Sequence, residues 1–195
     1  MRNRGVSFLG IVLLLTGLLT GCDKSSAAAG AEGAKKRAAD EVIVTMPATS
    51  EPESGFDPAY GWGAGEHVHE PLIQSTLTTT TKDLKIEKDL ATDYQVSPDG
   101  LTWTVTIRDD VAFTDGEPLT AKDVAFTYNH CKEKSTVNDF TMLDKAVAVD
   151  DKTVEFHMTR AFSIWPYTMA VVGIVPEHAY DENYGQNPVG SGRYI

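Results

Sequence analysis

A strict alternation of apolar and polar residues predicts a half-buried strand near the middle of the chain. Trp103, Val105 and Ile107 alternate with threonines, and this period of two places the three apolar side chains on one face. A Pro-Asp-Gly turn at 98–100 precedes the strand, and a helix is predicted to begin after Thr120, which has an acid three residues later as in a capping box. The buried face of that helix is predicted from apolar residues at helical spacing: Ala121, Val124, Ala125, Tyr128 and Cys131.

Shorter patterns predict further elements on both sides of this core. A loop rich in Pro, Ser and acid is expected at 47–58, and the threonine tract 78–81 favours a strand or an exposed turn. Strands are expected at 41–46, 111–113, 146–149, 153–158 and 171–175, of which 146–149 and 153–158 form a hairpin. Helical segments are expected at the start of 67–77, in part of 163–169, and from Pro176.

The N-terminus has the pattern of a secretory signal. Two arginines and no acid precede the apolar run 6–19, which is closed by Thr20, Gly21 and Cys22. The run is shorter than the roughly 20 apolar residues of a membrane-spanning helix. Leu-Thr-Gly-Cys at 19–22 resembles a bacterial lipobox, which implies cleavage after residue 21 and acylation of Cys22. The alternative is an ordinary signal peptide, 1–21, with a cysteine there by chance.

Residues 22–40 contain Ala, Gly, Ser and charge but no large apolar residue, so they predict a flexible tether. Removal of the signal leaves 15 basic and 28 acidic residues, a net charge of −13, and such a surface disfavours nucleic-acid binding. If Cys22 is acylated, Cys131 is the one remaining thiol. We therefore expect no disulfide and a buried Cys131.

Several ordered motifs carry a family resemblance. The stretch 103–128, WTVTIRDDVAFTDGEPLTAKDVAFTY, resembles family 5 of the extracellular solute-binding proteins, which serve peptide, dipeptide and nickel ABC importers. Phe-Asp-Pro at 56–58, Glu-Pro-Leu at 70–72 and Leu-Ala at 90–91, followed by Tyr94, are similar to further family motifs. The stretch 187–194, NPVGSGRY, also matches, with departures at Ser191 and Arg193.

The resemblance implies an α/β fold of the periplasmic-binding-protein type (type II, cluster C), with two lobes joined by a hinge. By analogy, 41–71 and 169–195 form part of the first lobe, and 72–168 form its extra α+β domain. The second lobe is expected to be absent from this chain, which looks truncated. Because the family encloses its solute between both lobes, the chain alone is expected to bind its ligand weakly or not at all.

The implied function is capture of di- or oligopeptides outside the inner membrane and delivery to ABC permease subunits, by a monomer lipid-anchored at the cell membrane and facing the periplasm or the cell exterior. Closure of the lobes on the solute needs no covalent chemistry and no cofactor. The candidate binding residues are the glycine-rich Tyr60, Gly61, Trp62, Gly63 and Ala64, because the corresponding loop of peptide-binding relatives meets the ligand. The alternative for Trp62 is packing in the core.

Other functions have weaker support. His67 and His69 could share a face as zinc ligands on a strand, but they diverge on the helix that we favour, and no third ligand stands at convincing spacing. A zinc-dependent hydrolase is therefore the less favoured alternative. Nickel or another small solute is a second one, and a purely structural lipoprotein a third. The sequence contains no G-x-S-x-G and no P-loop lysine, so neither a serine hydrolase nor the importer ATPase is indicated.

Overall fold

The computed structural model describes residues 54–60 and 71–194. All of them belong to one of the two compact units into which the chain divides, 46–195. The predicted strand 41–46, the tether 22–40 and the signal 1–21 lie outside the described residues, as does the predicted helical start at 67–70.

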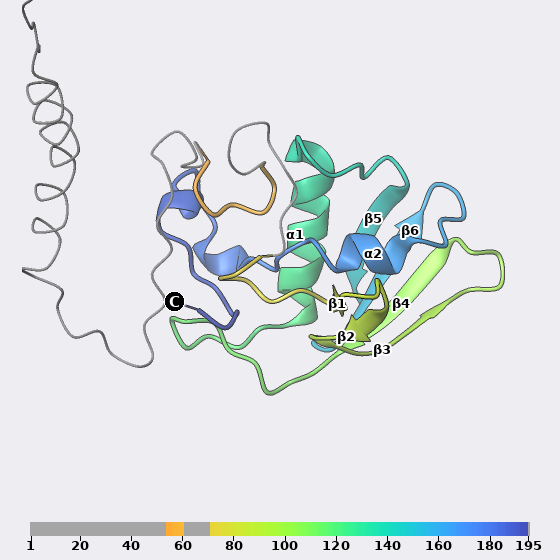
Figure 1. Cartoon of the computed structure of the whole chain (residues 1–195), viewed down its shortest axis with the longest axis horizontal. Coiled ribbons are helices and arrows are strands. Elements are labelled where there is room, and N and C mark those ends of the chain that lie inside the picture. The colour runs from red at the N-terminus through yellow and green to blue at the C-terminus, as the bar shows by residue number, and fades with distance from the viewer. Residues whose placement is uncertain (1–53, 61–70, 195) are drawn as a thin grey trace, which may run out of the picture. The chain divides into compact units, whose positions relative to one another are not determined.

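A four-stranded antiparallel sheet forms the centre of this unit (Figure 1). Its strands are β3 (Ala91–Val96), β4 (Thr102–Ile107), β5 (Leu143–Ala148) and β6 (Thr153–Met158), in the spatial order β3-β4-β6-β5. Both central strands alternate between buried and half-buried residues, so one face of the sheet is apolar. Trp103 opposes Phe156 and Val105 opposes Val154 across these strands. The predicted alternation and the predicted hairpin are confirmed, although β5 begins three residues earlier than expected.

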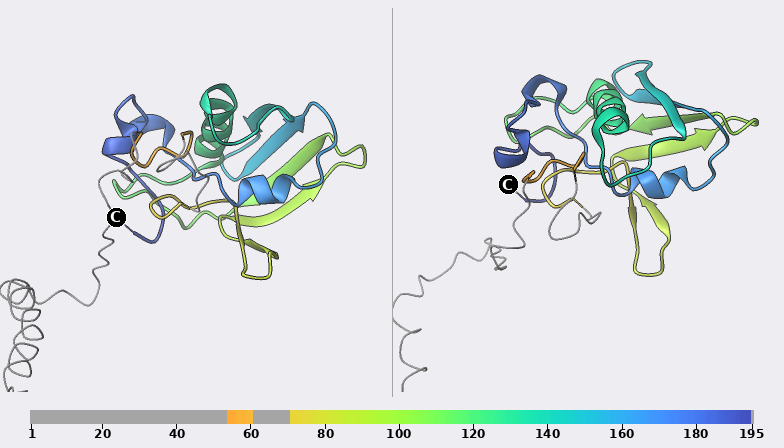
Figure 2. Two further views of the ribbon diagram at one scale, coloured as in Figure 1. Left: turned by 45° about the horizontal axis from the view of Figure 1, so that its top comes forward. Right: turned by 90° about the horizontal axis from the view of Figure 1, so that it is seen from above.

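Helix α1 (Ala121–Lys134) covers the apolar face of the sheet, as the two views of Figure 2 show. The capping box is present: the backbone N–H of Thr120 donates to the carboxylate of Asp123 over 2.9 Å, and Thr120 Oγ1 accepts from the first turn. All five predicted apolar positions are buried, including the Cys131 thiol. The predicted helix is therefore confirmed, with its cap and its face.

Aromatic rings fill the space between α1, the sheet and the short helix α2 (Trp165–Met169). The ring of Tyr128 lies 4.6 Å from that of Phe156 and 5.6 Å from that of Trp165, and Phe140 closes the group from the β5 side. All four are at least 96% buried. The edge-to-face angles are those that aromatic quadrupoles favour.

A second, two-stranded sheet lies next to α2. Strands β1 (Thr78–Thr80) and β2 (Ile86–Lys88) pair antiparallel, so the threonine tract is a strand. The hydroxyl of Thr78 is fully buried and donates to the backbone oxygen of Pro166 over 2.7 Å. This hydrogen bond ties the hairpin to α2.

Two predicted strands are wrong. Residues 111–113 make only an isolated bridge, Ala112 to Pro118, because the turn 114–117 folds straight back. Residues 172–175 are buried and Val171 is half-buried, but 171–175 do not form a strand, because their backbone N–H groups donate to unlike partners. Ile174 N donates to the oxygen of Ser75, and Val175 N donates to the side chain of Thr127. The apolar run at 171–175 therefore correctly indicated a largely buried segment, but it did not indicate strand pairing.

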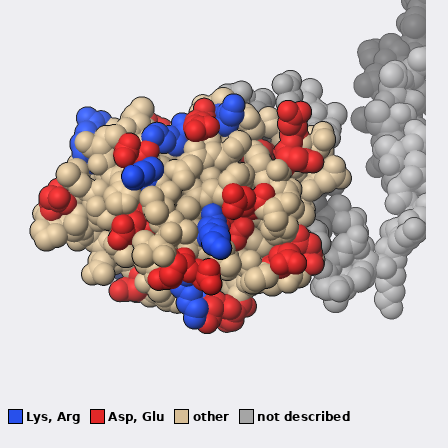
Figure 3. All heavy atoms as spheres, turned by 180° about the vertical axis from the view of Figure 1, so that it is seen from behind, with Lys and Arg blue, Asp and Glu red and all other residues tan. Residues whose placement is uncertain are grey.

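Acidic and basic side chains are interspersed on the face drawn in Figure 3, and no continuous basic area covers it. Neither of the two α-helices in the described ranges has the length and apolarity that crossing a bilayer requires.

Candidate functional site

Of the five predicted binding residues, the structure describes Tyr60. Gly61, Trp62, Gly63 and Ala64 lie outside the described residues, as do Cys22, His67 and His69. The side chain of Tyr60 is half-buried and packs against the core. The described residues show how both flanks of the candidate loop are held.

Asp57 fixes the N-terminal flank. Its side chain is only 9% exposed, and its Oδ1 accepts the backbone N–H of Ala59 over 2.9 Å. The backbone oxygen of Asp57 accepts the N–H of Tyr60 over 3.2 Å. Because the carboxylate is followed by Pro58, whose ring fixes φ, the chain leaves this turn in one defined direction.

A hydrogen-bonded chain extends from Asp57 into α1. The Tyr180 hydroxyl donates to Asp57 Oδ2 over 2.5 Å and lies 2.8 Å from His130 Nε2. A phenol has one proton, and Tyr180 gives it to the carboxylate, so His130 Nε2 must donate. Burial, followed by the hydrogen bond to Asp57, raises the pKa of Tyr180 well above its usual range and keeps this hydroxyl a donor.

Gln74 joins the C-terminal flank of the loop to the N-terminal flank. Its side-chain nitrogen donates to the oxygen of Phe56 over 2.9 Å and to the Tyr184 hydroxyl over 3.1 Å. Gln74 as a whole is 5% exposed. Tyr184 in turn donates to the oxygen of Val189 over 2.9 Å. A buried amide thus joins the described segment that ends at residue 60 to the described segment that begins at residue 71.

The Gly-Ser-Gly stretch 190–192 packs on the same flank. Gly192 N donates to the oxygen of Ile73 over 2.6 Å. A Cβ at Gly190 or Gly192 would meet that same oxygen at 2.2 Å or 2.5 Å. Ser75 Oγ donates to the oxygen of Ser191 over 2.7 Å. The glycines therefore serve close backbone packing. The side chain of Ser191, a departure from the family motif, accepts the backbone N–H of Ser75 over 3.3 Å.

No metal centre is formed by the part of the chain that the structure describes: no three His, Cys, Asp or Glu side chains converge there. Its three histidines have separate partners: Tyr180 for His130, Glu155 for His157 and Asp115 for His178. The contacts around Asp57 hold the backbone at Ala59 and connect the carboxylate to the Tyr180 hydroxyl.

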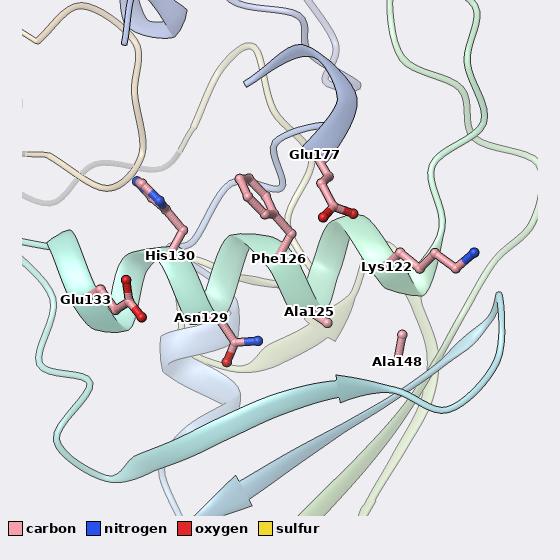
Figure 4. A pocket seen from close by; sticks show the side chains of 8 residues that line it. All are labelled: Lys122, Ala125, Phe126, Asn129, His130, Glu133, Ala148 and Glu177. Atoms are coloured by element: carbon pink, nitrogen blue, oxygen red, sulfur yellow. The ribbon is translucent and has the colours of Figure 1, made fainter. Parts of the chain in front are cut away.

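A shallow groove of about 430 Å³ lies along the outer face of α1, next to this site (Figure 4). His130 lies at one end of it, so one imidazole borders both the groove and the hydrogen-bonded chain. The lining residues are Lys122, Ala125, Phe126, Asn129, His130, Glu133, Ala148 and Glu177. Sequence reasoning missed the groove and the Asp57–Tyr180–His130 chain, because no periodic signal joins residues 123 positions apart.

Comparison with known proteins agrees with the family resemblance. The model of the bacterial extracellular solute-binding proteins, family 5 (middle region), matches residues 85–195. A probable D,D-dipeptide-binding periplasmic protein of Escherichia coli K12 is 29% identical over 146 residues, 69% of this chain and 28% of the relative. Protein XP55 of Streptomyces lividans is 34% identical over 170 residues, 81% of this chain and 30% of the relative.

The fold also matches solved structures. NikZ of Campylobacter jejuni, solved in complex with Ni(L-His), superimposes with a TM-score of 0.64 and 26% identity over 72% of this chain and 30% of NikZ. The fold is therefore that of the type II periplasmic-binding-protein-like proteins. This chain spans less than a third of the length of each of these proteins.

Proposed function

Because the chain belongs to family 5 of the bacterial extracellular solute-binding proteins, we propose that it forms part of the peptide receptor of an ABC importer. The match to the family model over 85–195 carries this proposal. A D,D-dipeptide-binding relative supports peptides as the solute class. The reaction is capture and release, driven by tighter binding to the closed form, with no bond made or broken.

We place solute contact at the loop 60–64. The buried anchors on its two flanks support this placement, since a binding loop on a rigid frame loses little freedom when ligand binds. Trp62 supplies a flat apolar surface, and Gly61 and Gly63 let a peptide backbone approach closely.

The test is isothermal titration and NMR with a pool of dipeptides. We expect weak binding to this chain, resonance shifts at 60–64, and loss of those shifts in Trp62→Ala. Tyr167→Ala, which removes an exposed aromatic of α2, is the matched control and should leave the shifts unchanged. Shifts that persist in Trp62→Ala, or that lie elsewhere, would contradict the placement. Micromolar affinity would contradict the expectation that the chain alone binds weakly.

A nickel chelate or another small solute is the second candidate, because NikZ was solved with Ni(L-His). Thermal shift with nickel, zinc and histidine separates the two: stabilisation by nickel with histidine, and not by dipeptides, would favour the chelate. Stabilisation by zinc alone would revive the hydrolase alternative at His67 and His69.

We also propose that Cys22 is acylated and that residues 22–40 tether a monomeric receptor to the cell membrane. The basic start, the apolar run and the lipobox-like 19–22 support this. Mass spectrometry of the protein from membranes should find Cys22 acylated and residues 1–21 removed. We further propose that 72–168 form the extra domain of the first lobe, since both sheets, α1 and all but the last residue of α2 fall within this range.

A further inference from the structure

The tip of the β1–β2 hairpin breaks a rule of turn chemistry. Residues 81–84 form a turn closed by Leu84 N donating to the oxygen of Thr81 over 2.9 Å, and Leu84 then has φ +59°. Glycine or asparagine usually takes this left-handed position, because a Cβ crowds the backbone there. Leu84 is the one non-glycine residue with positive φ in the described ranges.

The Leu84 side chain gains nothing from the fold in return. It is 70% exposed, the most exposed large apolar side chain in the described part of the protein. A strained backbone with an exposed apolar side chain points to a role outside the folded chain.

Neighbouring residues extend this apolar tip. Ile164 and Tyr167, one helical turn apart on α2, are 55% and 46% exposed, and the Tyr167 hydroxyl donates to the oxygen of Leu84 over 2.9 Å. In both views of Figure 2 the hairpin projects away from the sheet and from α1. The hydrogen bond places Tyr167 beside Leu84, and Ile164 lies three residues before Tyr167. We treat these three exposed apolar side chains, Leu84, Ile164 and Tyr167, as one apolar patch.

The charges beside the patch select its partner. Exposed Lys82 and Lys85 flank Leu84, with Asp83 between them, in a chain whose net charge is −11. An apolar residue flanked by lysines suits an anionic bilayer surface, where the leucine enters the acyl boundary and the ammonium groups meet lipid phosphates. The proposed anchor at Cys22 would hold the chain beside such a surface.

We propose that the patch formed by Leu84, Ile164 and Tyr167, with Lys82 and Lys85, contacts the anionic lipid of the membrane to which the chain is tethered. The contact is independent of the identity of the solute. It would orient the first lobe on the bilayer through a second point besides the N-terminal tether.

The test reads the environment of the patch itself. The protein used is the full chain with two substitutions, Cys22→Ser and Ser163→Cys. A nitrobenzoxadiazole label is attached at position 163, next to Ile164. Cys131 is buried and should not react with the label. Titration with vesicles that contain phosphatidylcholine and phosphatidylglycerol in a molar ratio of about 3:1 should shift the emission of the label to the blue. Pure phosphatidylcholine should shift it less, and a label at Asp150→Cys should respond little.

Variants separate the contact from folding. Leu84→Asn suits the left-handed backbone, so it should keep or raise the stability and yet lose most of the emission shift. Lys82→Gln and Lys85→Gln should each lower partitioning onto the anionic vesicles by about five-fold. Equal shifts at 163 and 150, or an unchanged shift in Leu84→Asn, would overturn the proposal. A shift that appears only in membranes containing the permease would also overturn it and assign the patch to a protein partner.

Discussion

The Asp57–Tyr180–His130 chain allows a sharp test by removal of one oxygen. Tyr180→Phe keeps the ring, which lies 5.5 Å from Phe126 and 5.0 Å from Tyr184, and deletes both hydrogen bonds of the hydroxyl. Asp57 Oδ2 then loses its protein donor at a site where the carboxylate is 9% exposed. The buried carboxylate has to find water or remain unpartnered.

The expected cost follows from the two bonds lost. A hydrogen bond to a charged group contributes about 1.5–3 kcal/mol and a neutral one about 1 kcal/mol, so the free energy of unfolding should fall by about 2.5–4 kcal/mol. With a urea m-value of about 2 kcal/mol/M, the midpoint of unfolding should fall by about 1–2 M. Urea titration followed by circular dichroism measures both quantities.

Tyr167→Phe is the matched control, since it deletes one neutral hydrogen bond from an exposed ring. It should cost less than about 1 kcal/mol. A double-mutant cycle of Tyr180→Phe with Asp57→Asn should show a coupling of at least about 1 kcal/mol. If Tyr180→Phe changes the free energy of unfolding by less than about 0.5 kcal/mol, the Asp57–Tyr180–His130 hydrogen bonds do not stabilise the turn at Asp57.

Three further predictions concern single side chains. The pair of His178 and Asp115, 2.8 Å apart, raises the pKa of the imidazole above 6.5 and lowers the pKa of the carboxyl below 3.8. Its stabilisation is therefore complete between pH 3.8 and pH 6.5, and it is lost as pH rises through the raised pKa or falls through the lowered one. His178→Asn should therefore cost more stability at pH 5.5 than at pH 9, by at most about 1 kcal/mol, and an equal cost at both values would contradict the pairing. Leu84→Asn should raise the free energy of unfolding by about 0.5–1 kcal/mol in urea titration, and a loss of stability would show that the side chain packs. Burial raises the pKa of the Cys131 thiol to about 12, so Ellman's reagent at pH 8 should not reach it until the protein unfolds; a fast-reacting thiol in the folded Cys22→Ser chain would contradict this.

The sequence predicted best where one local pattern determined one element. The strand at 102–107 and the helix at 121–134 follow from an alternation and a capping box, and both are observed. The strand expected at 171–175 failed because its apolar residues serve burial against several partners. Whether a strand ladder forms depends on a neighbouring segment that the run itself does not specify.

The site was less predictable than the fold. Asp57 was visible in the motif at 56–58, but its partners Tyr180 and His130 are distant in sequence and carry no shared period. The strain at Leu84 is likewise invisible to hydrophobic pattern, since leucine is neither a turn former nor a usual left-handed residue. Hydrogen bonds between residues distant in sequence, and the sign of the backbone angle φ, can be read only from the three-dimensional structure.

We propose that the receptor to which this chain belongs binds a peptide at 60–64 and leaves it chemically unchanged. The most direct test of this proposal is photo-crosslinking with a diazirine-bearing dipeptide, followed by mass spectrometry of both the protein and the unreacted ligand. We expect label within 60–64, competition by unlabelled dipeptide, and recovery of the free dipeptide intact. Label spread evenly over the surface, or a dipeptide recovered as hydrolysed products, would contradict it.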